Sequence, residues 1–389
     1  MTGSRCDVLI IGAGPTGLVL AGLLAQRGVD VVVLERRECS RQHSRAIGLH
    51  PPALVVLTEL GLAEAAVTAG VQVRSGTGWS RGRLLGELSF ATAWPERPYV
   101  LTLPQRRTEA LLTERLAQLA PGALRFGSEV IAVRAADDHV QVRARTVSSD
   151  DVIEWSARVV VGADGPHSTV RRSAGLAESL TRSPDCYLMG DFADPHRDPV
   201  AAVHLEPAGV VESFPLPEGM RRWVVHTSRA PRPEDPAILA SLIRNRIGTA
   251  PDPATATMVS AFGVRRRLAA GLVVGSAAII GDAAHEISPI GGQGMTLGWL
   301  DAQALAPLIL QSLASRIPLQ KLPATEHFER RRISAARAAA RQAEFNMRLG
   351  RPMSITRARA RDVLLRAALS TPARGALARA FTMRRALAG

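Results

Sequence analysis

Two patterns of hydrophobic and polar residues account for most of the 389-residue chain. In one, short apolar runs typical of buried parallel strands alternate with stretches whose apolar residues recur at helical spacing. In the other, apolar and polar residues alternate as in half-buried strands, with turn residues between them. The first pattern occupies residues 1–72, 101–178 and 266–325, the second occupies 73–100 and 179–265, and a third, purely helical pattern occupies 326–389. The chain is therefore predicted to be an α/β protein with an inserted antiparallel sheet and C-terminal helices that pack on the α/β domain.

A glycine-rich turn near the N-terminus stands in the context of a βαβ unit. The apolar strand Val8 to Ile11 leads directly into Gly12-Ala13-Gly14-Pro15-Thr16-Gly17, a helical pattern follows, and a second strand ends in Glu35. The first glycine permits the tight turn, the second lets the backbone approach a pyrophosphate, and the third allows close packing of helix on strand. Glu35 can bind the hydroxyls of an adenosine ribose. The motif predicts a dinucleotide site without distinguishing FAD from NAD.

Two further strands also end in an acidic residue. The run Leu272 to Ile280 predicts one buried strand that ends at Gly281-Asp282, and a glycine-rich turn leads from there to a helix that starts near Met295. A carboxylate can accept hydrogen bonds from hydroxyl groups, and a helix N-terminus favours negative charge. Asp164-Gly165, at the end of another strand, is a second carboxylate of this kind, although an Asp-Gly turn is also common without any ligand.

The composition narrows the possible partners. The net charge of +13 comes almost entirely from arginine, since Lys321 is the only lysine. Such a charge is compatible with nucleic acid, with an anionic membrane or with the arginine bias of a GC-rich genome. The arginines are spread over the whole chain and aromatic residues make up only 4%, so we expect no nucleic-acid partner.

The cysteines and the apolar stretches indicate the compartment. Cys6, Cys39 and Cys186 are isolated, and no Cys/His spacing typical of a metal site occurs, so we expect neither disulfides nor a bound metal. The longest apolar runs are too short for a transmembrane segment, and the N-terminus does not have the pattern of a signal peptide. We therefore expect a cytoplasmic protein, either a monomer or a homodimer.

In their order along the chain, the three strand-end motifs and the antiparallel region between the last two resemble a known family over roughly residues 5 to 315. This family is the class A flavoprotein monooxygenases, FAD-dependent aromatic hydroxylases with the para-hydroxybenzoate hydroxylase fold. The resemblance implies a Rossmann-like FAD-binding domain of the GR2 type with an inserted antiparallel β-sheet substrate domain. The chain is similar to the short members of the family, because it shows no thioredoxin-like C-terminal extension.

The resemblance also implies which residues contact the cofactor. Glu35 would bind the adenosine ribose, Asp282 would bind the ribityl hydroxyls, and the turn from Pro289 would line the flavin ring. Arg45 would contact FAD or NAD(P)H. The full set of cofactor-binding residues is Gly12, Gly14, Pro15, Thr16, Gly17, Glu35, Arg36, Arg45, Gln105, Asp164, Gly281, Asp282, Pro289, Gly291, Gly292, Gln293, Gly294 and Met295.

Few residues of the substrate site emerge from the sequence. His204 and His226 lie in predicted strands of the inserted sheet and are weak candidates for substrate contact. The only tyrosines, Tyr99 and Tyr187, do not match the substrate-binding tyrosines of the family. We assign no catalytic acid or base, because the flavin carries the chemistry.

The implied reaction is a monooxygenation. NAD(P)H, with NADPH favoured, would reduce FAD, and O2 would form a flavin C4a-hydroperoxide that transfers one oxygen atom to an aromatic or polycyclic substrate, such as a secondary metabolite or a quinone. A flavin-dependent reductase or dehydrogenase of isoprenoid or polyketide substrates is the first alternative. A flavin-binding protein without turnover is the second. A halogenase is disfavoured, because its lysine and its Trp-x-Trp-x-Ile-Pro stretch have no counterpart in this sequence.

Overall fold

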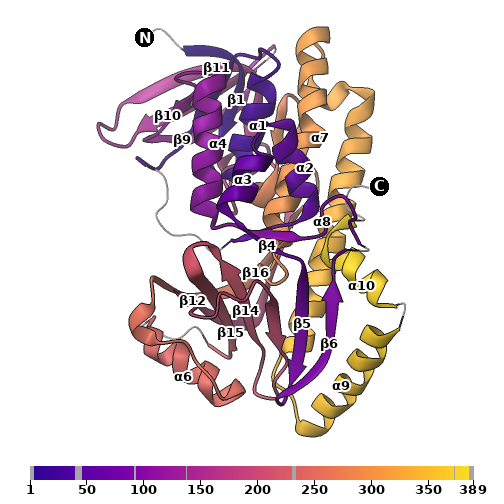
Figure 1. Ribbon diagram of the computed structural model, residues 1–389. Helices are drawn as coiled ribbons and strands as arrows, with labels where there is room; N and C mark the ends of the chain where they lie inside the picture. Colours follow the sequence, from indigo (N-terminus) through magenta and orange to yellow (C-terminus); the bar gives the residue numbers. More distant parts are fainter. Residues whose placement is uncertain are drawn as a thin grey trace.

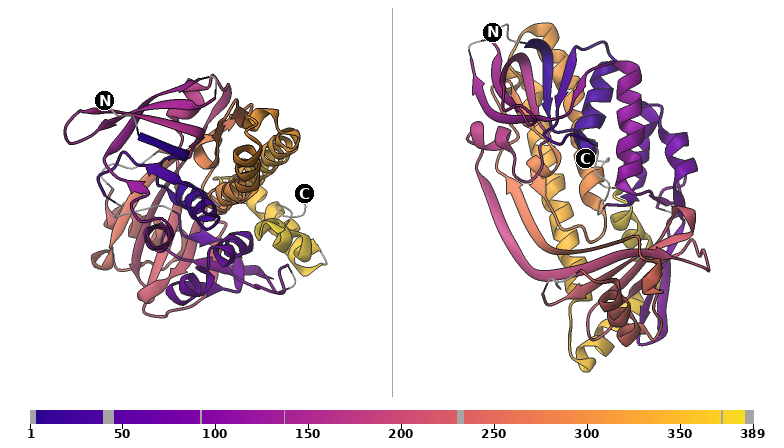
Figure 2. Two further views of the ribbon diagram at one scale, coloured as in Figure 1. Left: turned by 90° about the horizontal axis from the view of Figure 1, so that it is seen from above. Right: turned by 90° about the vertical axis from the view of Figure 1, so that its left-hand side faces the viewer.

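The computed structural model describes residues 4–39, 46–91, 93–136, 138–229, 234–371 and 373–384. Two parts lie one above the other in Figure 1, each built on its own large sheet. The upper part contains the N-terminal βαβ unit. In the right-hand view of Figure 2, long curved strands of the lower sheet rise into the upper part. None of the helices in the described ranges has both the length and the apolar character of a membrane-spanning helix.

The upper sheet is mainly parallel and has the strand order β17-β18-β11-β1-β2-β8. Its strands are β17 (Val273–Val274), β18 (Ala277–Ile279), β11 (Val152–Gly162), β1 (Ser4–Ile11), β2 (Val31–Leu34) and β8 (Leu124–Arg125), and β9 (Ser128–Ala135) and β10 (Val140–Thr146) continue antiparallel from the first half of β11. The uninterrupted apolar run of β1 is explained by its position, because Val8, Leu9 and Ile10 are completely buried between neighbouring layers.

Helices cover this sheet, and α1 packs against both α4 and α7. The helices of the upper part are α1 (Pro15–Ala25), α2 (Pro51–Glu59), α3 (Ala63–Ala69), α4 (Gln105–Leu119), α5 (Thr169–Ser173) and α7 (Gln293–Ser315). The prediction of one strand over residues 272–280 is wrong. The run 272–280 is not a single strand but a hairpin of β17 and β18, because Gly275, with φ of +60°, reverses the chain between them. Only β18 joins the parallel sheet through β11.

The lower sheet has the order β19-β16-β12-β15-β14-β13-β5-β6 and is antiparallel except for the pair β13 and β5. Its strands are β19 (His285–Glu286), β16 (Met258–Ala269), β12 (Glu178–Ala193), β15 (Met220–Thr227), β14 (Val211–Leu216), β13 (Ala201–His204), β5 (Ser75–Ser80) and β6 (Arg83–Ser89). Strands β12 and β16 run across the boundaries placed at 178/179 and 265/266, so the two parts share continuous strands rather than flexible linkers.

The two faces of the lower sheet have different neighbours. Helix α6 (Pro236–Ile247) covers the outer face, where Leu188 and Val225 pack with Leu239. The inner face is turned toward the glycine-rich turn after Asp282, because residues of β12 and β15 form one hydrophobic cluster with Ile290 of that turn. Smaller elements complete the structure: β3 (Gly48–Leu49), β4 (Val71–Val73), β7 (Val100–Thr102) and the 3-10 helices η1 (Pro217–Gly219), η2 (Pro253–Thr255), η3 (Gly281–Ala283) and η4 (Leu319–Lys321).

The C-terminal helices correct a further expectation. Helix α8 (Pro323–Gly350) packs on α7 of the upper part and on β16 of the lower sheet, and it runs beside both parts in Figure 1. Helix α9 (Ile355–Ser370), however, packs on β6 of the lower sheet. Helix α10 (Ala373–Phe381) packs on β6 and also contacts the upper part, where the ring of Phe381 lies edge-on to His50 with centroids 5.7 Å apart. Gly86 of β6 allows this close approach, since a Cβ atom there would lie 2.8 Å from Cβ of Leu369.

Candidate functional site

The three strand-end motifs lie side by side at one edge of the upper sheet. Ile11 of β1 pairs with Gly162 of β11, and Gly162 pairs with Ile279 of β18, all in parallel. The chain leaves these strands at Gly12, at Asp164 and at Gly281. In open parallel sheets, ligands bind at the carboxyl ends of the strands. The structure therefore brings together motifs that are more than 100 residues apart in the sequence.

The first motif forms a turn with no room for side chains at two of its glycines. Gly12 has φ of +103°, and a Cβ atom at Gly12 would overlap the carbonyl of Ala163, while one at Gly17 would overlap the carbonyl of Gly12. A Cβ atom at Gly14, in contrast, would have no other group within 4 Å. Helix α1 begins at Pro15 with no side-chain cap, so its first N–H groups can bind an anion that approaches over Gly14.

Glu35 is buried at the end of β2 and already accepts several hydrogen bonds. The backbone N–H of Ala13 donates to its Oε2 at 2.8 Å, and Arg37 donates to its Oε1 through the backbone N–H at 3.0 Å and through Nε at 2.9 Å. Burial would raise the pKa of Glu35, but the bonds from Arg37 and Ala13 hold it below its ordinary value. The sequence pointed to Arg36, which is exposed; Arg37 is the residue that reaches the carboxylate.

Asp164 has one satisfied and one unsatisfied oxygen. Its Oδ2 accepts from the backbone N–H of Thr169 at 2.6 Å, at the start of α5. Its Oδ1 is buried and has no hydrogen-bond partner in the described part of the chain. Burial raises the pKa of this carboxyl group. An unsatisfied buried acceptor is costly, so Oδ1 marks a position where a ligand hydroxyl or N–H group would be stabilising.

The Gly281-Asp282 turn is held from behind by a buried ionic network. Asp301 of α7 accepts from the backbone N–H of Gly281 at 3.1 Å, from Nε2 of His285 at 2.5 Å and from Nε of Arg332 at 2.6 Å. Burial would lower the pKa of His285, but Asp301 raises it. Asp282 itself is exposed at the edge of the sheet. The network fixes the backbone of the turn and leaves the Asp282 side chain on the accessible side.

Arg171 connects the second and third motifs. Its Nη1 donates to the carbonyl of Ala283 at 2.7 Å and its Nη2 donates to the carbonyl of Pro166 at 2.8 Å. Its Nε forms an ion pair with Glu178 at 2.6 Å. The side chain is only 3% exposed. This arginine therefore keeps the loops after β11 and β18 at a fixed separation.

The turn between Pro289 and the start of α7 has two consecutive glycines in left-handed conformations. Gly291 has φ of +94° and Gly292 has φ of +65°. Nε2 of His50 donates to the carbonyl of Gly291 at 3.0 Å, because a carbonyl oxygen can only accept. Burial lowers the pKa of His50 to about 4, so the ring is neutral near pH 7. Helix α7 begins at Gln293, two residues before the predicted start, and it has no side-chain cap. Its free N–H groups thus lie directly after the turn.

Several predicted residues lie near this group without a contact that fixes their role. Gln105 donates from Nε2 to Glu109 at 2.8 Å at the start of α4, and Gln293 is buried and reaches the carbonyl of Ala380 at 3.5 Å. Met295 and Thr16 are half-buried. Arg45 lies outside the described residues.

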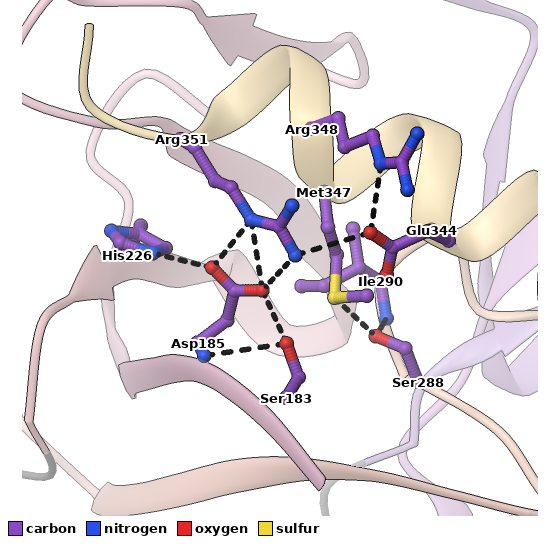
Figure 3. A network of polar contacts seen from close by, with 9 residues as sticks. All are labelled: Ser183, Asp185, His226, Ser288, Ile290, Glu344, Met347, Arg348 and Arg351. Carbon is purple, nitrogen blue, oxygen red and sulfur yellow. Dashed lines mark hydrogen bonds and ion pairs between the residues drawn. The ribbon is translucent and has the colours of Figure 1, made fainter. Parts of the chain in front are cut away.

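The two histidines of the lower sheet lie on different faces. His226 is buried on the inner face, and its Nε2 lies 3.0 Å from Asp185, which also binds Arg351 at the end of α8 (Figure 3). His204 points to the other face by strand alternation and stacks on Trp79 with ring centroids 6.2 Å apart. The structure brings His226, but not His204, to the side of the sheet that faces the glycine-rich turn.

The site has the features that an FAD molecule requires. A dinucleotide needs an uncapped helix N-terminus at its pyrophosphate and an acid at its ribose, and α1 and Glu35 meet these needs at one sheet edge. A flavin adds hydroxyl donors and a ring that becomes anionic on reduction. The unsatisfied Oδ1 of Asp164, the exposed Asp282 and the uncapped start of α7 are complementary to those groups.

A family model and several curated proteins match most of the chain. Residues 5–341 match the family model described as FAD binding domain. The chain is 35% identical over 311 residues to the 6-methylpretetramide 4-monooxygenase of Streptomyces rimosus, an alignment that covers 77% of this chain and 55% of the relative. It is 35% identical over 309 residues to the rifampicin monooxygenase of Streptomyces venezuelae, which covers 76% of this chain and 62% of that protein. The chain thus spans little more than half the length of these curated relatives.

A solved structure extends the likeness to the whole chain. The crystal structure of p-nitrophenol 4-monooxygenase from Pseudomonas putida DLL-E4 superposes with a TM-score of 0.85 and covers 98% of both chains. The sequence identity to that protein is 21%, so this likeness shows the fold.

Proposed function

Since the chain belongs to the FAD-binding domain family, we propose that it is an FAD-dependent monooxygenase that uses NAD(P)H and O2 to insert one oxygen atom into an aromatic or polycyclic substrate. One observation carries the proposal. The glycine-rich turn at the sheet edge that fits FAD meets the inner face of the lower sheet, because Ile290 of this turn belongs to a hydrophobic cluster on that face. A substrate bound there would lie next to the flavin ring.

The relatives indicate the class of substrate. The two curated relatives are monooxygenases whose names specify 6-methylpretetramide and rifampicin as substrates. By analogy, we propose a polycyclic or quinone-like aromatic of secondary metabolism for this chain. We further propose the sheet-based division into a nucleotide-binding domain and a substrate domain as the functional division of the molecule.

The chain's own residues would hold the cofactor and orient it. The N-terminus of α1 would bind the pyrophosphate, Glu35 would bind the adenosine ribose in exchange for part of its bonding to Arg37, and Asp282 would bind the ribityl hydroxyls. The start of α7 would place its partial positive charge at the pyrimidine edge of the flavin ring. When bound, FAD supplies hydride acceptance from NAD(P)H and oxygen transfer from O2.

The apolar cluster would keep water away from the reacting atoms. Met189, Val224, Phe262 and Ile290 pack together between the inner face of the sheet and the turn. A dry site strengthens the electrostatic effect of the α7 N-terminus and limits hydrolytic side reactions. The protein needs no nucleophile of its own for this chemistry, and we propose none.

Asp282 provides the test. We expect Asp282→Ala to lose most of its FAD on gel filtration and to consume little O2 with NADPH and an aromatic substrate. Asp138→Ala is the matched control, because this aspartate is 83% exposed in the connection between β9 and β10. An Asp282→Ala protein that retains FAD and full oxygen consumption would contradict the assignment.

The same assay separates the alternatives. A reductase or dehydrogenase would reduce its flavin without using one O2 for each molecule of product. A binding protein without turnover would retain FAD, but no aromatic compound would accelerate NADPH oxidation. Oxygen uptake coupled to hydroxylated product therefore distinguishes the proposed monooxygenase from both.

A further inference from the structure

The charged groups on the inner face of the lower sheet are mostly paired within the protein. Arg222 binds Asp191 through two bonds of 2.6 and 2.7 Å. Asp185 is bound by Arg351 and His226 (Figure 3). These pairs neutralise the charges on this face, so neither arginine offers an uncompensated positive charge to a ligand.

Glu212 is the exception. It is near the start of β14, between its cross-strand neighbours Val203 and Val224. Val224 belongs to the hydrophobic cluster that includes Ile290 of the glycine-rich turn, and Val203 packs against this cluster, so Glu212 stands on the same face as they do. The carboxyl group has no hydrogen bond or ion pair within the described part of the chain, yet it retains some accessible surface. Burial raises its pKa to about 7.

Tyr187 contributes a second unsatisfied group on this face. The side chain is completely buried, and its Oη has no hydrogen-bond partner among the described residues. Its ring stacks on Phe262 with centroids 5.5 Å apart, which fixes the direction of the hydroxyl group. Burial and the negative charge of Glu212 both raise the pKa of this tyrosine, so the hydroxyl remains protonated and can donate.

A structural role explains neither group. A carboxyl group among valines costs free energy unless it finds a donor, and a buried tyrosine hydroxyl normally has a partner. An apolar side chain at either position would fill the same space without this cost. A ligand that supplies complementary hydrogen-bonding groups between the sheet and the turn would therefore stabilise the pair.

We infer that Glu212 and Tyr187 form the polar end of the substrate pocket and select an aromatic molecule without a carboxylate, whose hydroxyl group donates a hydrogen bond to Glu212. This inference rests on the proposed function and narrows its substrate class. Above its raised pKa of about 7, Glu212 is negatively charged and repels carboxylated aromatics, and neither Arg222 nor Arg351 is free to compensate for this charge. A phenolic hydroxyl group that donates to a carboxylate also makes its own aromatic ring richer in electrons. An electron-rich ring reacts more readily with an electrophilic oxygen atom.

A matched pair of probes tests the selection. At about pH 8, where Glu212 is ionised, the FAD-loaded wild-type protein is titrated with 2-naphthol and with 2-naphthoate, and binding is followed by the change in flavin absorbance. We expect 2-naphthol to bind at least about tenfold more tightly, the size of one charge-assisted hydrogen bond. Glu212→Gln, which keeps the side-chain shape, should reduce this ratio about tenfold, mainly through tighter binding of 2-naphthoate.

Two further variants keep the test decisive. Tyr187→Phe should weaken 2-naphthol binding without improving that of 2-naphthoate, because it removes only the hydroxyl group. Glu87→Gln on β6 is the control, since Glu87 is an exposed glutamate of the same sheet, and its ratio should equal that of the wild type.

The outcomes separate the inference from the proposed function. Equal or stronger binding of 2-naphthoate by the wild type, an unchanged ratio in Glu212→Gln, or no binding of 2-naphthol would overturn the inference. FAD content and NADPH-driven oxygen uptake, measured on the same samples, report on the proposed function. A protein that retains FAD and consumes oxygen but does not discriminate between the probes refutes the inference alone.

Discussion

Glu212 also makes a quantitative prediction for the stability of the protein without cofactor. Burial raises the pKa of its carboxyl group from 4.5 to about 7. A difference of one in pKa between the folded and unfolded states corresponds to about 1.4 kcal/mol, so full ionisation of Glu212 should cost the folded state about 3 kcal/mol. Because the side chain retains some contact with water, this figure is an upper value.

The sign of the effect follows from the direction in which the pKa moves. Below the unfolded pKa, Glu212 is protonated in both states, so its ionisation does not affect the free energy of unfolding. As the pH rises to about 7, the unfolded chain releases its proton first, and stability is lost progressively. Glu212→Gln removes this ionisation. We therefore expect the variant to be more stable than the wild type by up to about 3 kcal/mol at about pH 8, but by less than about 1 kcal/mol at about pH 5.

Urea unfolding of the FAD-free proteins, followed by tryptophan fluorescence at both pH values, measures this difference. Glu87→Gln serves again as the control and should match the wild type at each pH. A Glu212→Gln protein whose advantage over the wild type is the same at both pH values would refute the reasoning, because the carboxyl group would then not carry a raised pKa in the folded state.

Two other predictions concern the buried ion pairs. Asp301→Ala leaves the guanidinium of Arg332 buried without its carboxylate, so we expect a loss of about 3–5 kcal/mol in the free energy of unfolding by urea. Asp301→Leu combined with Arg332→Met should recover part of this loss. Equal stability of Asp301→Ala and the wild type would contradict a stabilising role of this ion pair. The second variant, Arg351→Met, acts on Asp185. Burial would raise the pKa of the Asp185 carboxyl group, but the bonds from Arg351 help to lower that pKa to about 2. The pair's stabilisation is present above the unfolded pKa of about 4 and is lost as the pH falls toward about 2, so the variant should show a smaller loss of stability over this interval, measured by acid unfolding.

The sequence was sufficient to predict the features that depend on contiguous residues. The βαβ unit from β1 to Glu35 was predicted correctly because strand, turn and helix each have a local pattern. The family that the motif order indicated was confirmed by the match over residues 5–341. The assignment of each cofactor contact stays a prediction until FAD is observed, even though the structure brings Gly12, Asp164 and Asp282 to one sheet edge.

The missed features depend on contacts between distant residues. Asp301, His285 and Arg332 form one network, but nothing in their local patterns distinguishes them from surface charges of a helix or a turn. Arg37 was overlooked in favour of Arg36, because only the folded turn shows which of two adjacent arginines points back to Glu35. Glu212 could have been noticed as an acid in an apolar strand, but the sequence does not show that it lacks a partner.

The position of α8 has a consequence for how the two parts can move. In its first half, Arg332 is bonded to Asp301 of the upper part, and just beyond its end Arg351 is bonded to Asp185 of the lower sheet. At 1.5 Å for each helical residue, these anchors are about 28 Å apart along an essentially inextensible rod. The separation between the two parts is therefore set by the length of one helix. Any relative movement of the upper part and the lower sheet must therefore keep these two anchor points at this separation while both ion pairs hold.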